Sequence, residues 1–252
     1  METNLPRPVY GFAKRVADVL ISSAALLLLL PLFLPLALLL RLTGEGEVLY
    51  LQDRVGFGGR TFKLMKFATM LKNSPNIGTR TITTRNDPRV LPFGRCLRKT
   101  KINELPQILN VLKGDMSIVG PRPLTRETFS MYSEEVRRVV ARNVPGLTGI
   151  GSVVFRDEEA LLNAGRRSVH DVMRTEIAPF KGALEMWYDR RKSPFVDIAI
   201  TALTMLAILW PGNQMHNRVI RGLPRRGVPA HCGSPGVGVG PDELAAQART
   251  MF

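Results

Sequence analysis

A long uncharged apolar run near the N-terminus most constrains what this chain can form. Residues 19–40 carry no charged side chain and are rich in leucine. At about 1.5 Å of rise per residue, a helix of this length reaches ~33 Å, about the thickness of the hydrocarbon core of a bilayer. A buried helix of a soluble protein would show polar residues at helical spacing, and this run has none after Ser23. The run therefore predicts a helix inserted in a membrane.

The same run is too long for a cleaved signal peptide. The apolar region of a signal peptide covers about 7–15 residues and ends at a small-residue cleavage site, whereas this run closes on three leucines before Arg41. Pro31 and Pro35 interrupt its middle, and each removes a backbone N–H donor. Basic residues flank both ends, so the positive-inside rule gives no direction. Two alternatives stay open: a kinked helix that spans the membrane, and a re-entrant helix that enters and leaves by the same face.

The charge balance of the chain points to polyanionic partners. The sequence has 35 Lys and Arg against 21 Asp and Glu, a net charge of +14. Phosphorylated substrates, an anionic membrane face and nucleic acid would all suit this excess. We expect no nucleic-acid partner, because the chain has no recognition-helix, zinc-finger or basic-aromatic signature. Two cysteines and three histidines are too few for a disulfide framework or a histidine-rich metal site.

The distribution of apolar residues divides the chain into three segments. Residues 1–44 form a membrane-anchoring segment, residues 45–210 a soluble domain, and residues 211–252 a tail rich in Gly and Pro. The tail has few aliphatic residues and is expected to be mostly disordered. The domain is expected to be a small mixed α/β (α+β) fold. Its β-prone runs 48–55 and 61–67 are separated by Gly56-Phe57-Gly58-Gly59, which predicts a hairpin or a glycine-rich turn, and helical patterns follow them.

A second apolar stretch, residues 195–210, carries a single polar stripe. Asp197, Thr201 and Thr204 fall at positions i, i+4 and i+7, which lie on one face of a helix. This pattern predicts an amphipathic helix lying in the membrane interface. A helix packed on the core of the domain would show the same pattern, so both alternatives stay open.

A helical pattern in the middle of the chain begins beside a polar pair. Asn103 and Glu104 precede Pro106, and apolar residues then recur at helical spacing until Gly114. Asn is a favoured N-cap residue and Pro is tolerated in a first turn, so we expect Asn103 to cap this helix. The free N–H groups at such a helix start favour anions.

An arginine between two prolines follows that helix. Pro121 and Pro123 restrict the backbone on either side of Arg122 and hold its guanidinium on a stiff segment. Such a mount suits a phosphate, which Arg can bind through two parallel hydrogen bonds. Without further context, the motif also describes a rigid turn that exposes an arginine.

Several motifs occur in order along the chain and carry a resemblance. They are Lys14-Arg15 with Asp18, QDRVG at 52–56, KLMKF at 63–67, ELPQ at 104–107, NVLKGDMSIVGPRP at 110–123 and PGLTG at 145–149. From about residue 14 to 206, the chain resembles the bacterial sugar transferases, the small membrane-bound polyprenol-phosphate phosphoglycosyl transferases. The resemblance marks residues 45–210 as the phosphoglycosyl transferase domain.

This resemblance implies a reaction and a location. The family transfers a sugar 1-phosphate from a nucleotide diphosphate sugar, usually a uridine one, to a polyprenol phosphate, and releases a nucleoside monophosphate. The product starts glycan or exopolysaccharide assembly at the bacterial inner membrane, with the catalytic domain on the cytoplasmic face. The family's membrane segment is re-entrant, its expected cofactor is Mg²⁺, and further partners would be a second copy of the chain or glycan-assembly enzymes.

The resemblance and the charges together select the candidate site. The expected catalytic residues are Glu104, Asn103 and Asp115, and Glu104 is also the expected magnesium ligand. The expected substrate-binding residues are Lys66, Arg98, Arg122, Pro121, Pro123 and Arg54. Phosphoryl transfer depends on charge stabilisation and alignment more than on strong acids or bases, and these cations supply the charge.

One position departs from the family motif. The family reads Asp-Glu-Leu-Pro, and its Asp takes the phosphosugar covalently before polyprenol phosphate attacks, but this chain has Asn103. An uncharged amide is a poor nucleophile toward phosphorus and a weaker magnesium ligand than a carboxylate. Three interpretations stay open. Glu104 takes over the role, Asp115 or one of the carboxylates at 157–159 substitutes, or the chain is a non-catalytic member that binds polyprenol phosphate or nucleotide sugar.

Overall fold

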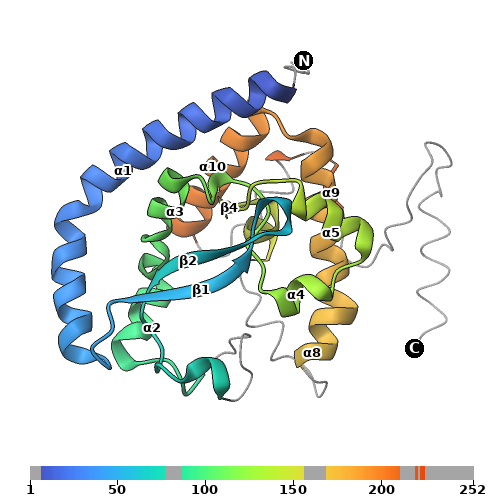
Figure 1. Cartoon of the computed structure of the whole chain (residues 1–252). Helices are drawn as coiled ribbons and strands as arrows, with labels where there is room; N and C mark the ends of the chain where they lie inside the picture. Colours follow the sequence, from blue (N-terminus) through green and yellow to red (C-terminus); the bar gives the residue numbers. More distant parts are fainter. Residues whose placement is uncertain (1–6, 78–86, 156–168, 211–218, 221, 225–252) are drawn as a thin grey trace, which may run out of the picture.

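The computed structural model places one long helix along the side of a domain of helices and short strands (Figure 1). It describes residues 7–77, 87–155, 169–210, 219–220 and 222–224. The α-helices are α1 (Arg7–Thr43), α2 (Pro92–Lys99), α3 (Gln107–Lys113), α4 (Arg126–Ser130), α5 (Glu134–Ala141), α6 (Ile150–Val154), α8 (Val169–Val172), α9 (Ala178–Arg191) and α10 (Pro194–Leu209). Shorter turns are η1 (Phe57–Gly59), η2 (Ser74–Asn76), η3 (Ile102–Glu104) and the π-helical η4 (Met173–Ile177). The strands are β1 (Leu49–Val55), β2 (Thr61–Phe67), β3 (Ser117–Val119) and β4 (Gly146–Thr148), and the expected mixed fold class is confirmed.

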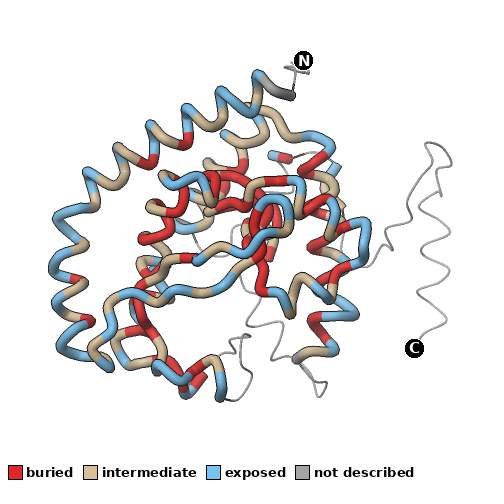
Figure 2. The backbone as a smooth tube through the Cα atoms, viewed as in Figure 1, coloured by how far each residue is buried: buried red, intermediate tan, exposed pale blue. Residues whose placement is uncertain are grey.

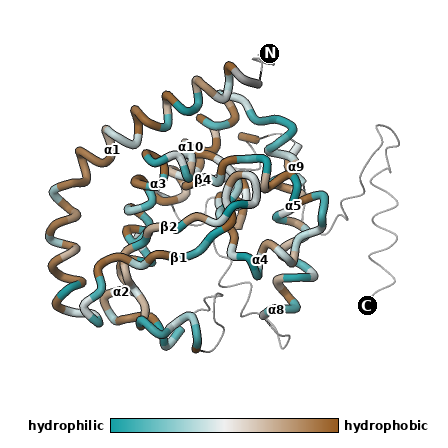
Figure 3. Tube along the Cα trace, in the orientation of Figure 1, coloured by the Kyte–Doolittle hydropathy of each residue, from teal (hydrophilic) through white to brown (hydrophobic). Residues whose placement is uncertain are grey.

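Helix α1 continues through Pro31 and Pro35 and follows a broad arc around the domain (Figure 1). A proline inside a helix removes a hydrogen bond and commonly bends the axis. The middle of α1 is apolar and largely exposed (Figures 2 and 3), with Leu27, Leu28 and Leu34 exposing 73%, 79% and 77% of their surface. Within the described part of the chain, α1 is the one helix long and apolar enough to cross a membrane.

The N-terminal half of α1 is bonded to the domain. Arg15 donates hydrogen bonds to the carbonyl oxygens of Val111 and Leu112, at 2.6 and 2.8 Å. Asp18 accepts a hydrogen bond from the backbone N–H of Ile118 in β3, at 3.0 Å. The last carbonyls of a helix lack the usual partners inside the helix, and Arg15 adds hydrogen bonds to two of them; the carbonyl of Val111 also accepts the N–H of Gly114 at 3.0 Å.

The C-terminal half of α1 packs against the same domain. Leu36 and Leu40 are buried in an apolar cluster with Phe67 and Leu97, and Phe33 meets Phe67 edge-on at 5.6 Å between ring centroids. Both ends of α1 therefore touch one domain while its leucine-rich middle is exposed. The two alternatives left open for this segment, a spanning and a re-entrant helix, both stay predictions.

Two small sheets organise the domain. Strands β1 and β2 form an antiparallel hairpin, paired from Leu49 with Phe67 to Val55 with Thr61. Its turn places Gly58 at a φ of 69°, a left-handed conformation that glycine adopts without a steric penalty. The predicted hairpin is therefore confirmed. Strands β3 and β4 pair in parallel and bring the segments after each strand together.

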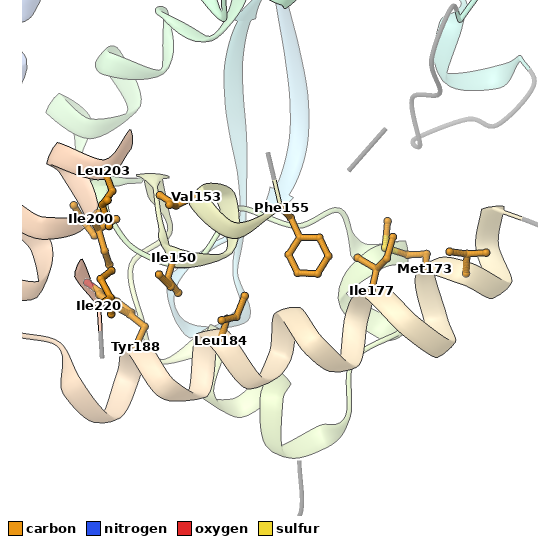
Figure 4. Packing of buried hydrophobic residues seen from close by; sticks show 12 residues of the cluster. Ile150, Val153, Phe155, Met173, Ile177, Leu184, Tyr188, Ile200, Leu203 and Ile220 are labelled. Atoms are coloured by element: carbon orange, nitrogen blue, oxygen red, sulfur yellow. The ribbon is translucent and has the colours of Figure 1, made fainter. Parts of the chain in front are cut away.

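The main hydrophobic core lies between α6, α9 and α10 (Figure 4). Ile150, Leu184 and Ile200 are almost fully buried in it. Ile220 also packs in this cluster, although it belongs to the segment 211–252. Most of that predicted tail lies outside the described residues.

Helix α10 turns its polar stripe toward the protein. Asp197 accepts hydrogen bonds from the hydroxyls of Tyr10 and Tyr188, at 2.7 and 2.8 Å, and pairs with Lys14. The exposed side chains of α10 are instead apolar and include Phe195, Ile198, Met205 and, at its end, Trp210. Helix α10 therefore packs on the core, as one of the two alternatives expected, and the location of its exposed apolar face in the membrane interface stays a prediction.

Candidate functional site

One cleft gathers most of the predicted substrate-binding residues. It is lined by Arg54, Leu64, Lys66, Glu104, Gln107, Arg122, Pro123, Gly146 and Leu147. These residues come from the β1–β2 hairpin, from η3 and the start of α3, and from the segments after β3 and in β4. The fold therefore brings side chains from four distant parts of the sequence to one place.

The turn η3 carries Glu104 into this cleft. Lys101, just before η3, has a positive φ of 61°, which is uncommon for a residue with a side chain. Pro106 occupies the cap position of α3, and no side chain caps that helix. The prediction that Asn103 is the N-cap is therefore wrong, because the left-handed turn at Lys101 places Asn103 inside η3. The Oδ1 atom of Asn103 is buried and has no hydrogen-bond partner among the described residues.

A buried amide fixes α3 against the hairpin. Asn110 accepts a hydrogen bond from the backbone N–H of Met65 at 2.9 Å and donates one to the carbonyl of Lys63 at 2.8 Å. Both partners belong to β2, next to Lys66. A fully buried amide with satisfied hydrogen bonds holds a single orientation. It therefore sets the position of Lys66 relative to the start of α3, where Glu104 lies.

Glu104 is the one carboxylate among the residues that line the cleft. Its Oε1 atom lies 3.8 Å from Nη2 of Arg122. Burial by itself raises the pKa of Glu104, but the positive charges of Arg122, Lys66, Lys101 and Arg98 outweigh it and lower the pKa to about 2. Glu104 is therefore ionised at neutral pH.

The cations of the cleft are partly removed from water. Burial lowers the pKa of Lys66 to about 7; the carboxylate of Glu104 opposes this shift and the neighbouring arginines add to it. Burial also lowers the pKa of Arg54 to about 10, with a further contribution from the charge of Arg122. Three cations and one carboxylate line the cleft, so it lacks counter-anions. A diphosphate would supply them, and Arg can bind phosphate oxygens in pairs.

The Pro-Arg-Pro segment is joined to the hairpin. Arg54 donates a hydrogen bond to the carbonyl of Pro123 at 3.0 Å and a second to Oε1 of Gln52 at 2.6 Å. Arg122 contacts Oγ of Ser152 at 3.4 Å through Nη1. Arg122 is therefore more than a surface arginine on a rigid turn: it reaches both Glu104 and the start of α6.

Some predicted site residues lie elsewhere. Asp115 follows the opposite end of α3, where it lies 3.5 Å from Lys113 and accepts a hydrogen bond from Asn110, and it does not line the cleft. Arg98 on α2 acts through its charge and is not a lining residue. Pro121 is almost fully buried and lines a neighbouring cleft. The carboxylates at 157–159 lie outside the described residues.

The structure adds four lining residues to those expected at the site, Leu64, Gln107, Gly146 and Leu147, and two of them are of particular note, Gln107 and Leu147. Gln107 is 4% exposed, lies three residues after Glu104 in the sequence and lines the same cleft. Both belong to motifs visible in the sequence, ELPQ and PGLTG. Neither residue carries a charge, so a prediction of site residues from charge does not include them.

The residues present fit a magnesium ion that enters together with a diphosphate. Among the described residues, no three His, Cys, Asp or Glu side chains converge as a metal-binding group. Mg²⁺, however, is commonly held by one or two carboxylates with substrate phosphates and water. Glu104 offers an ionised carboxylate, and Asn103 offers a buried amide oxygen that has no hydrogen-bond partner among the residues the structure describes.

Comparison with known proteins finds related sequences that cover most of the chain. A family model described as bacterial sugar transferase matches residues 9–211. A UDP-N-acetylgalactosamine-undecaprenyl-phosphate N-acetylgalactosaminephosphotransferase of Aeromonas hydrophila is 42% identical over 207 residues, which are 81% of this chain and 45% of that protein. The exopolysaccharide production protein ExoY of Rhizobium meliloti strain 1021 is 34% identical over 82% of this chain and 90% of its own length. A UDP-glucose:undecaprenyl-phosphate glucose-1-phosphate transferase of Caulobacter vibrioides is 36% identical over 83% of this chain and 74% of its own. The chain thus spans less than half of the Aeromonas protein but most of the other two.

Proposed function

Because the chain belongs to the bacterial sugar transferase family, we propose that it transfers a sugar 1-phosphate from a UDP-sugar to undecaprenyl phosphate. The products would be a polyprenyl diphosphate sugar and UMP, and the step would begin exopolysaccharide or glycan assembly. The observation that carries this proposal is the cleft in which Arg54, Lys66 and Arg122 surround one ionised carboxylate, Glu104. Such a cleft suits a substrate with two adjacent phosphates.

The cations of the cleft would bind and align the diphosphate. Arg122 lies between Glu104 and α6, and its guanidinium can hold two phosphate oxygens at once. Lys66 and Arg54 would offset the charge that accumulates on the departing UMP. This stabilisation of charge, in a site partly shielded from water, is the main catalytic contribution in phosphoryl transfer.

Glu104 would take over the role of the family's nucleophilic Asp. In the first step, an oxygen of Glu104 bonds to the phosphorus that carries the sugar, and the bond from that phosphorus to the UMP oxygen breaks. In the second step, a phosphate oxygen of undecaprenyl phosphate bonds to the same phosphorus and the carboxylate leaves. Neither step requires a general base, because both attacking oxygens are already ionised at neutral pH.

Magnesium, where bound, would offset the negative charge of the phosphates, and Glu104 and Asn103 are the residues that would hold it. The side chains of this protein would have roles of their own beside the charge that magnesium offsets. Arg122, Lys66 and Arg54 bind and orient the donor, and Glu104 supplies the carboxylate.

The membrane arrangement suits a lipid acceptor. The exposed middle of α1 and the exposed apolar side of α10 would both lie in lipid, as their leucine, phenylalanine and tryptophan side chains require. Both ends of α1 touch the domain that holds the cleft. We therefore place α1 as a re-entrant helix in the inner membrane, with the cleft on its cytoplasmic side, where UDP-sugars are found.

A second candidate function rests on Asn103. If the amide abolishes covalent chemistry, the chain would bind UDP-sugar or undecaprenyl phosphate without turnover, and its role would lie in a glycan-assembly complex. The buried cations would serve binding equally well in that case. Activity, rather than affinity, separates the two candidates.

The decisive experiment measures UMP release by the full-length protein in detergent or nanodiscs. UDP-glucose and UDP-N-acetylgalactosamine would each be supplied with Mg²⁺ and undecaprenyl phosphate to wild type, Asn103→Asp and Glu104→Gln. Asp53→Asn is a matched control, because Asp53 is an exposed carboxylate that pairs with Lys63 at 2.9 Å outside the cleft. We expect turnover by wild type and the control and none by Glu104→Gln. If wild type released no UMP and Asn103→Asp did, the result would instead support the binding function.

A further inference from the structure

A second cleft shares Arg122 with the first. It is lined by Pro121, Arg122, Leu124, Tyr132, Val140, Gly151, Lys181 and Glu185. Most of this lining is apolar and buried. Glu185, from α9, is therefore unusual: it is only 5% exposed, and no motif in the sequence marks it.

Glu185 contacts both segments that hold Arg122. Glu185 and Arg122 line the same cleft, and the backbone N–H of Arg122 acts on the Glu185 carboxylate to lower its pKa. The Oε1 atom of Glu185 also lies against α6 at Gly151. A side chain at this position would not fit unless the carboxylate moved, because a Cβ atom added to Gly151 would lie 2.9 Å from Oε1 of Glu185. The next residue, Ser152, is the one whose hydroxyl meets the Arg122 guanidinium. Glu185 thus lies behind the arginine, against its backbone and against the start of α6.

This carboxylate is costly for the fold. Its Oε2 atom is buried and has no hydrogen-bond partner in the described part of the chain. Burial raises the pKa of Glu185 to about 7, and the charge of Lys181 and the N–H of Arg122 offset only part of that effect. A buried carboxylate with incomplete hydrogen bonding destabilises a fold relative to an apolar side chain of similar size. Its presence beside Arg122 is explained if it serves the site.

We propose that Glu185 is a positioning residue: it holds the backbone of the Pro-Arg-Pro segment so that the guanidinium of Arg122 points at the diphosphate of the nucleotide sugar. Glu185 itself does not touch substrate in this arrangement. Its effect reaches the ligand only through Arg122, and this dependence can be measured. The identity of the ligand rests on the proposed function.

The test is a double-mutant cycle between Glu185 and Arg122. The dissociation constants of UDP-glucose and UDP-N-acetylgalactosamine would be measured for the full-length protein carrying Glu185→Met, Glu185→Gln, Arg122→Ala, and Arg122→Ala combined with Glu185→Met. We expect Glu185→Met to weaken binding about tenfold, while Glu185→Gln, which keeps an acceptor for the Arg122 N–H, stays within about threefold of wild type. In the Arg122→Ala background, Glu185→Met should have no further effect. An unchanged affinity for Glu185→Met, or the same loss with and without Arg122, would overturn the proposal.

A second variant keeps the proposal testable if Glu185→Met does not fold. Gly151→Ala would push the carboxylate away from the Arg122 backbone without changing it, and should cause a similar loss that also disappears in the Arg122→Ala background. Asp189→Asn is the control on the same helix, because Asp189 is buried and bonded to Arg142, Asn143 and Lys192. It should lower thermal stability but leave the dissociation constants unchanged. A Gly151→Ala variant that binds like wild type would count against the proposal.

The outcomes separate this proposal from the proposed function. A wild type that binds a UDP-sugar but releases no UMP would disprove transferase activity, and the cycle would still decide the role of Glu185. A wild type that binds neither UDP-sugar would disprove both. In an active protein, Glu185→Met should raise KM and leave kcat within about threefold, whereas general damage to the fold would lower the active fraction and hence kcat.

Discussion

The Nη2 atom of Arg122 lies 3.8 Å from Oε1 of Glu104, which is a loose ion pair rather than a tight one. The Arg122 side chain remains 42% exposed. Its donors are therefore not committed to the carboxylate, and a phosphate can reach them without first breaking a strong pair. The loose spacing also leaves the Glu104 oxygens accessible to a phosphorus atom held by Arg122.

Replacing Arg122 should weaken donor binding. We expect Arg122→Ala to reduce the affinity for a UDP-sugar by roughly 1.5–3 kcal/mol, the usual contribution of a hydrogen bond to a charged group. Arg122→Lys should recover only part of this, because an ammonium group cannot form the paired hydrogen bonds of a guanidinium. Isothermal titration with UDP-sugar checks both variants, and equal affinities for all three proteins would remove Arg122 from the site.

Glu104 should be required for an exchange reaction that needs no lipid. A covalent route predicts that wild type exchanges labelled UMP with UDP-sugar in the absence of undecaprenyl phosphate, and that Glu104→Gln does not. Circular dichroism would confirm that the variant is folded, since Gln keeps the size of the side chain. Exchange that appears only after undecaprenyl phosphate is added would mean direct transfer, with Glu104 in a supporting role.

Donor affinity should fall as the pH rises above about 7. Burial lowers the pKa of Lys66 to about 7, so its positive charge is present below that pH and is lost above it in the free protein. A diphosphate binds the charged form, and we expect its dissociation constant to increase progressively between pH 7 and pH 9. Lys66→Arg keeps its charge over this range and should flatten the profile. That comparison separates Lys66 from Glu185, whose pKa is also about 7. A flat wild-type profile would contradict the assignment.

The bond between α1 and α3 should contribute to stability. Arg15→Ala removes the hydrogen bonds to the carbonyls of Val111 and Leu112, and of these two the Val111 carbonyl keeps the N–H of Gly114. We expect a loss of about 1–3 kcal/mol in the free energy of unfolding, seen as a lower melting temperature in detergent. Arg95→Ala, at an exposed position on α2, is the control and should melt near wild type. Equal melting temperatures for Arg15→Ala and Arg95→Ala would show that the Arg15 hydrogen bonds contribute little to the free energy of unfolding.

Both ends of α1 should be reached from the same side of the membrane. In a background with Cys96→Ser and Cys232→Ser, single cysteines at Phe12 and Glu45 would be labelled with a membrane-impermeant maleimide. Both positions are exposed in the structure and flank the apolar run. We expect both to react in inside-out vesicles and neither in intact spheroplasts. Labelling of the two sites from opposite sides would establish a spanning helix.

Local signals predicted much of this structure. The hairpin followed from β-prone runs around Gly56–Gly59, and the end of α3 from Gly114, which adopts a φ of 92°. Motif and charge alone also identify the cleft cations Arg54, Lys66 and Arg122.

Other features depend on contacts that the sequence does not display. The N-cap prediction for Asn103 failed because Lys101 adopts a left-handed turn that only the surrounding structure stabilises. Glu185 lies on a helix without a recognisable motif, and the packing of α9 against α5 and α6 brings it to Arg122. The polar stripe that begins at Asp197 faces inward because Tyr10 and Lys14 from α1 reach it.

Arg15 of α1 donates hydrogen bonds to the C-terminal end of helix α3, and Glu104 precedes the N-terminal end of the same helix. In the membrane arrangement that we propose, the helix that lies in lipid is therefore fixed by hydrogen bonds to the helix beside the proposed nucleophile. The bilayer surface would then set the height of Glu104 above the lipid headgroups. An acceptor whose phosphate lies at headgroup depth would meet the carboxylate at one level, whereas a water-soluble donor could approach from any height.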